Sequence, residues 1–201
     1  MAGTLVLLAQ DITSVFLNIP ESVLFGVDAE NKDKLIAKQT DTTTVSVISP
    51  LNGVVKRLQL TDDFIALQTS DAGTLQIKLL PLVNDSKIIC VVNTVCGKAC
   101  DSHIRFFNTN WTPLTDTGIL FSEPAKDWFI KSDADRSDQN FVNAYIALDM
   151  IPQKIVLGAH DLSLTVYCDI ENYLSAGDYK NIKPYLSELS KVYKWDKISF
   201  K

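Results

Sequence analysis

The sequence of 201 residues predicts an α+β fold, with a mostly antiparallel meander sheet of about eight or nine strands. Short segments rich in β-branched and alternating apolar residues follow one another through the middle of the chain, with turn residues between them. Helical periodicity is concentrated near the two ends of the chain, and strands do not alternate with helices as a parallel sheet requires. We therefore expect the N-terminal and C-terminal helices to pack on one face of the sheet.

The first part of the chain predicts two helices. Asp11 is a suitable N-cap, and apolar residues follow it at positions 12, 15, 16 and 19, which is helical spacing. Pro20 ends this helix, because proline lacks the backbone N–H that a helix interior needs. A second helix is expected within residues 21–38, where the later positions carry alternating charges.

The next part predicts a series of short strands. We place them over residues 42–48, 54–60, 64–68, 75–79, 88–95 and 104–107. Turn residues separate them, and Asn52-Gly53 is the strongest hairpin signal among these turns. The segment 88–95 is almost wholly apolar, so we expect it to be a central strand that is covered on both faces.

The last part returns from strands to a helix. Residues 131–140 are polar and predict a mobile loop. Strands are expected over residues 142–150, 154–157, 162–168 and 191–200, and a helix over residues 172–188 that Pro184 limits or divides. The expected organisation is one domain over residues 10–201, and a division near residues 122–141 is the alternative.

Charge and hydropathy narrow the classes of partner. The chain carries 19 Lys and Arg against 24 Asp and Glu, a formal net charge of −5. Nucleic-acid binding needs clustered basic residues, so we expect no nucleic-acid partner. No apolar run is long enough to cross a bilayer, so we expect no membrane span.

Residues 1–9 look like the remnant of a signal peptide or of a cloning-derived leader. Leu5 to Leu8 would be the end of its apolar region, and Ala9 the small residue before cleavage. The basic start of a signal peptide is missing and the apolar region is short. A short buried strand or the start of a helix is the alternative.

The four cysteines allow two disulfides. They are Cys90, Cys96, Cys100 and Cys168. The most favourable pair is Cys96 with Cys100, because a hairpin loop over residues 97–99 would place the two side chains opposite each other. The alternative is four buried free thiols that act as small apolar residues.

Four stretches carry a resemblance to a known family. They are DITSVFLNIPESVL, LQLTDDFIALQTSDAGTLQIKLLPL, VVNTVCGKACDSHIRFFNTNWTPL and YLSAGDYKNIKPYLSELSKVYKWD. Together the chain resembles, over roughly residues 10–200, a family of exported Bacteroidales proteins catalogued as domain of unknown function 3256. The resemblance implies a leader and a periplasmic or cell-surface location. It implies no activity, cofactor or functional residue.

The sequence contains no recognisable set of catalytic or metal-binding residues. Cys96, Cys100 and His103 have a spacing that zinc could use, but a disulfide would compete for the two cysteines. Asp133 and Asp135 begin a pattern like a calcium loop, which then lacks the glycine and the glutamate that such loops use. We therefore expect no metal and no cofactor.

The sequence is most consistent with a non-catalytic binding or interaction domain. Its partner would be a protein or a glycan of the cell envelope, and Trp111, Trp128 and Phe129 could form an aromatic recognition patch. The alternative is a hydrolase-type enzyme whose site is assembled from distant residues. The candidates for that site would be Asp101, His103 and Asp161.

Overall fold

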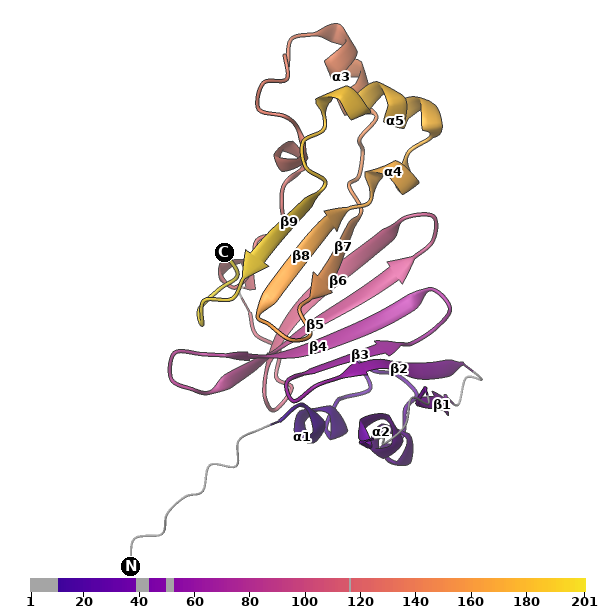
Figure 1. Cartoon of the computed structure of the whole chain (residues 1–201), viewed down its shortest axis with the longest axis vertical. Helices are drawn as coiled ribbons and strands as arrows, with labels where there is room; N and C mark the ends of the chain where they lie inside the picture. Colours follow the sequence, from indigo (N-terminus) through magenta and orange to yellow (C-terminus); the bar gives the residue numbers. More distant parts are fainter. Residues whose placement is uncertain (1–10, 39–43, 50–52, 116) are drawn as a thin grey trace, which may run out of the picture.

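The computed structural model of this chain describes residues 11–38, 44–49, 53–115 and 117–201. Its strands form two antiparallel sheets, one with the order β1-β2-β3-β4-β5-β6 and one with the order β7-β8-β9 (Figure 1). The predicted α+β class and the antiparallel meander are confirmed. The predicted leader over residues 1–9 and the residue Asn52 of the predicted turn lie outside the described residues.

The strands of the six-stranded sheet are β1 (Ser46–Ile48), β2 (Val54–Leu60), β3 (Phe64–Gln68), β4 (Gly73–Pro81), β5 (Lys87–Cys96) and β6 (Cys100–Asn108). Those of the smaller sheet are β7 (Gln153–Leu157), β8 (Ser163–Cys168) and β9 (Ser190–Lys194). The α-helices are α1 (Ile12–Leu17), α2 (Ala29–Ile36), α3 (Gln139–Ile146), α4 (Ile170–Tyr173) and α5 (Ala176–Ile182). None of these helices is long and apolar enough to cross a bilayer.

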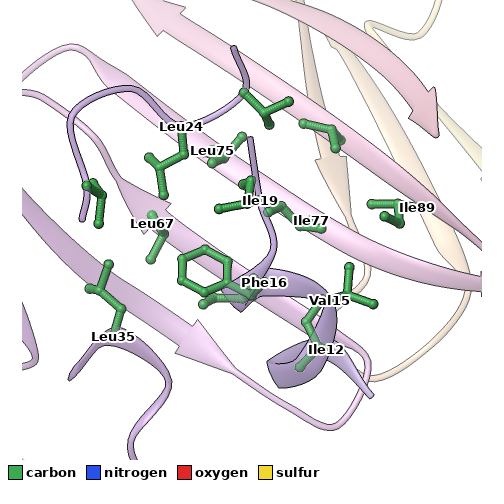
Figure 2. Packing of buried hydrophobic residues seen from close by; sticks show 14 of the residues in the cluster. Ile12, Val15, Phe16, Ile19, Leu24, Leu35, Leu67, Leu75, Ile77 and Ile89 are labelled. Carbon is green, nitrogen blue, oxygen red and sulfur yellow. The ribbon is translucent and has the colours of Figure 1, made fainter. Parts of the chain in front are cut away.

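Helices α1 and α2 cover one face of the six-stranded sheet. Asp11 caps α1 by accepting a hydrogen bond from the backbone N–H of Ser14 at 2.8 Å. The buried face of α1 then places Phe16 against apolar side chains of β3 and β4, including Leu67 and Ile77 (Figure 2). Burial of one such side chain contributes about 1.5–3 kcal/mol. We call this cluster the N-terminal core, and it holds α1 and α2 on the six-stranded sheet.

The three-stranded sheet packs on the opposite face, over the β4–β6 side (Figure 1). Its strand β7 lies nearest the larger sheet, and two side chains of that sheet bond to the backbone of β7. The Gln76 side chain accepts from the N–H of Leu157 at 2.9 Å and donates to the carbonyl of Ile155 at 3.1 Å. Ser102 Oγ accepts from the N–H of Ile155 at 2.9 Å. Side chains of the six-stranded sheet therefore form hydrogen bonds with backbone groups of β7, which is an edge strand of the smaller sheet.

The third core lies at the end of the three-stranded sheet that is far from α1 and α2 (Figure 1). Helices α3, α4 and α5 contribute to it, together with Phe129 and Ile130. The C-terminal helices therefore pack in their own core, not beside the N-terminal helices.

The predicted strand over residues 142–150 is wrong, because helix α3 occupies most of this segment. Apolar residues recur at every second position from Val142 to Met150, which imitates a strand. In the structure Asp138 caps the helix, and the helical spacing of Phe141, Ala144 and Leu148 faces the third core. Burial of these three side chains outweighs the local alternation.

Candidate functional site

The three candidate catalytic residues are not brought together. Asp101 lies at the start of β6 and accepts from the backbone N–H of Gln153, where β7 begins. Asp161 lies in the turn that follows β7, at its other end. Hydrogen bonds from the Ser163 hydroxyl and backbone lower the pKa of Asp161, so this carboxyl is an ionised turn residue. The hydrolase site expected as the alternative is therefore not assembled by these residues.

Glu123 is a neighbour of Asp101 and His103 that the sequence did not reveal. Loss of water around its carboxyl raises the pKa of Glu123, the charge of Asp101 raises it further, and His103 opposes this rise. All three residues are exposed at the surface. The hydroxyl of Ser102, between Asp101 and His103 in the sequence, bonds to the Thr94 hydroxyl and to the backbone N–H of Ile155.

The candidate metal ligands are engaged in local structure. Cys96 and Cys100 form a disulfide, so they are not available to zinc. Asp135 accepts from the hydroxyl and the backbone N–H of Ser137, which is a turn contact. In the described part of the chain, no three His, Cys, Asp or Glu residues are grouped to hold a metal ion.

The three aromatic residues do not form one patch. Trp111 is buried in the N-terminal core, where its Nε1 donates to the carbonyl of Val15 at 3.0 Å. Phe129 is fully buried in the third core, with Trp128 edge-to-face against it at 5.0 Å. Trp111 is therefore separated from the other two rings, and of the three only Trp128 remains partly exposed.

The Cys96–Cys100 disulfide joins directly opposed residues of β5 and β6, with Cα atoms 4.0 Å apart. Cys90 and Cys168 are free thiols buried in the cores. Burial raises the pKa of Cys168 to about 11 and also raises the pKa of Cys90, so neither is a reactive thiolate at neutral pH.

Reduction of this disulfide is expected to lower the free energy of unfolding by about 2 kcal/mol, because a bridge four residues apart closes only a short loop. Urea unfolding with and without reductant measures this difference. A Cys96→Ala/Cys100→Ala variant is the control, since reductant should leave its midpoint unchanged. An unchanged midpoint for the natural chain would contradict the expectation.

One exposed surface remains where the two sheets meet, and we call it the corner surface. Its first wall is the part of the six-stranded sheet that the smaller sheet leaves uncovered, at β1 and β2. Ile48 and Leu58 are 70% and 56% exposed there, and Val54 pairs with Ile48 across the two strands. Their neighbours Val47 and Val55 point to the opposite face, into the N-terminal core.

The second wall of the corner surface is the outer face of the three-stranded sheet. Val156, Thr165 and Val192 lie in one row across its strands, and Lys154 pairs with Tyr167 in the next row. Val192 and Tyr167 are exposed. The alternate residues of these strands face the apolar core between the two sheets, where Ile155, Leu164 and Val166 are buried.

A groove of about 250 Å³ runs along the line where the walls meet. It is lined by Leu58, Gln59, Phe64, Ala66, Thr74, Gln76, Val156 and Leu157. No carboxylate lies among these residues. Lys56 and Lys154 stand on the two walls, and neither has a carboxylate within ion-pair distance among the described residues. The groove itself is lined by apolar and neutral polar side chains, and the two lysines lie outside it on the adjoining strands.

Comparisons with known proteins give one family match and a similar solved structure. The model of a family described as "Protein of unknown function (DUF3256)" matches residues 4–200. The solved structure of a domain of an uncharacterized protein from Porphyromonas gingivalis W83 is 30% identical, with a TM-score of 0.83, and the match covers 93% of this chain and 96% of that one. No curated protein matches the sequence.

Proposed function

The chain belongs to the DUF3256 family of proteins of unknown function, and on that basis we propose that it is an exported domain that binds a partner protein without catalysing a reaction. The corner surface is the binding surface of this proposal. The family membership agrees with the resemblance in the sequence, and it assigns no activity that the proposal would have to explain.

Two features support export. The Cys96–Cys100 disulfide is a bond that persists in oxidising compartments such as the periplasm or the cell surface. The apolar residues Leu5 to Leu8, followed by Ala9, fit the end of a signal peptide. Fractionation of cells that express the natural gene tests this part of the proposal. Recovery of the protein in the cytoplasm alone would contradict it.

The observation that carries the binding proposal is the groove together with the exposed apolar side chains beside it. Leu58 lines the groove and is 56% exposed, and Ile48 and Val192 are exposed on the strands that adjoin it. A solvent-exposed Ile48 or Leu58 gains free energy when a partner covers it, and contiguous exposed apolar surface typically marks interaction sites. Lys56 and Lys154 add a requirement on charge, because complementary potentials favour a partner with carboxylates. The partner is therefore an extended protein segment that carries apolar and acidic side chains.

Selection from a displayed library of random peptides, with the folded chain as target, tests this function. Enriched peptides should combine aliphatic with acidic residues. Their affinity should fall at least tenfold, about 1.4 kcal/mol, in a Lys56→Glu/Lys154→Glu variant. A Lys98→Glu/Lys180→Glu variant has the same net charge and should keep its affinity, since both lysines lie outside the corner surface.

Three outcomes would overturn the proposal. The library could yield no enriched peptide, or the two charge-reversed variants could bind equally. The chain could also self-associate in light scattering and become monomeric on Leu58→Glu substitution, which would make a second copy of the chain the occupant. Circular dichroism of each variant separates loss of binding from loss of folding.

A further inference from the structure

A second concave site lies on the surface of the helical region, between α3 and α5, and it does not share a residue with the groove of the corner surface. Its volume is about 430 Å³, which is within the usual range for small-ligand pockets. The residues around it are Asn140, Asn143, Ala144, Ala147, Asp178, Lys180, Asn181, Pro184 and Tyr185.

The cleft presents side-chain amides from both of its walls. Asn140 and Asn143 lie on one face of α3, and Asn181 lies opposite them on α5. Gln139 donates to the Asn143 Oδ1 at 2.9 Å, which orients that amide. Within the described ranges, no hydrogen bond engages the side-chain amides of Asn140 and Asn181. Each free amide offers two donor hydrogens and an acceptor oxygen to a ligand.

The charges and the apolar part of the cleft restrict the ligand further. Asp178 and Lys180 are the two charged residues that line the cleft, and the carboxylates of Asp135 and Asp138 act on Tyr185 from beside it. The cleft therefore has no excess of positive charge to attract a phosphate. Ala144, Ala147 and Pro184 form small apolar surfaces between the amides. A neutral ligand with hydroxyl groups on one side and a less polar surface on the other fits both parts.

Tyr185 gives the cleft a fixed ring. Its hydroxyl donates to Asp138 Oδ2 at 3.2 Å, and its ring is held edge-to-face by Phe141, with centroids 5.2 Å apart. These contacts fix the side chain before a ligand arrives, which reduces the entropy that binding costs. An aromatic ring can cover the C–H side of a sugar, while the amides bond to its hydroxyls.

We infer that the cleft between α3 and α5 binds a neutral carbohydrate. The amides of Asn140, Asn143 and Asn181 bond to the sugar hydroxyls, and Ala147, Pro184 and Tyr185 contact its less polar side. The inference is independent of the corner surface, so a glycan and a protein segment could occupy the two sites separately.

Nuclear magnetic resonance of the full chain, titrated with cellobiose, maltose, lactose and N,N′-diacetylchitobiose, tests the inference. At least one of these neutral sugars should shift the signals of Asn140, Asn143 and Asn181. An Asn140→Ala/Asn181→Ala variant should bind that sugar at least tenfold more weakly. Asn110→Ala is the matched control, because this exposed asparagine lies outside the cleft, and its affinity should stay unchanged.

The inference fails if none of the four sugars shifts signals in α3 or α5. It also fails if glucose 6-phosphate or an uncharged peptide causes larger shifts there, or if the double variant binds as well as the natural chain. The Lys56→Glu/Lys154→Glu variant distinguishes this site from the corner surface, because it should bind the sugar with unchanged affinity.

Discussion

Replacement of Asp63 by alanine is expected to lower the free energy of unfolding by about 2–4 kcal/mol, because it leaves a buried ammonium group without its counter-charge. Lys78 is only 2% exposed, and its Nζ lies 2.9 Å and 3.0 Å from the two carboxylate oxygens of Asp63. The remaining hydrogen-bond partner would be the carbonyl of Ala159, at 3.4 Å, and the charge of Asp161 would still act on the ammonium group from a greater distance. The Asp63 side chain itself is 38% exposed. In the variant, water should therefore reach the ammonium group of Lys78 and keep the loss in free energy of unfolding below that for a fully buried pair.

A Lys78→Met variant is expected to cost less than Asp63→Ala. Methionine fills a similar volume and removes the buried charge, while the remaining Asp63 can be hydrated. Urea unfolding of both variants measures the difference, and the adjacent Asp62→Ala should change stability by no more than about 0.5 kcal/mol. Equal losses for Asp63→Ala and Asp62→Ala would show that the ion pair contributes nothing.

Substitution of Gln76 by leucine is expected to cost about 2–4 kcal/mol, because it leaves two backbone groups of β7 without partners. The Gln76 side chain bonds to the N–H of Leu157 and the carbonyl of Ile155, and these bonds join the two sheets. Leucine has a similar size but can bond to neither group. The loss therefore measures unsatisfied polar groups and not a cavity.

Gln68→Leu is the matched control for this substitution. Gln68 ends β3 on the same face, next to Thr74, and no side-chain hydrogen bond involves it in the described ranges. Its replacement should change stability by about 0.5 kcal/mol or less. Hydrogen exchange at the Leu157 amide gives a local readout, since exchange should become faster in Gln76→Leu alone. Unchanged protection of that amide would contradict the role of Gln76.

Local signals in the sequence predicted much of the fold. The N-cap at Asp11 acts within a few residues, and the structure begins the first helix there, although the helix ends at Leu17, before the predicted break at Pro20. The meander strands follow from alternation and short turns, which require no knowledge of distant residues. The opposition of Cys96 and Cys100 follows from a single tight hairpin.

The binding surfaces could not be predicted in the same way. Lys56 and Lys154 lie 98 positions apart, and they share the corner surface only because β7 crosses the larger sheet. Asn140 and Asn181 face one cleft only because α3 forms a helix, where the sequence alternates like a strand. Trp111 and Trp128 show the reverse case, since Trp111 is buried in the N-terminal core and Trp128 packs, partly exposed, against the third core.

By itself, the sequence determined the class of the fold, the run of hairpins and the helix at the start of the chain, because caps, turns and periodicity act over a few residues. The tertiary structure alone decided how the nine strands divide into two sheets, and which polar side chains satisfy the edge of β7. It also decided which apolar residues stay exposed. Those outcomes depend on burial and hydrogen bonding between segments that are far apart in the chain, and no local pattern encodes them.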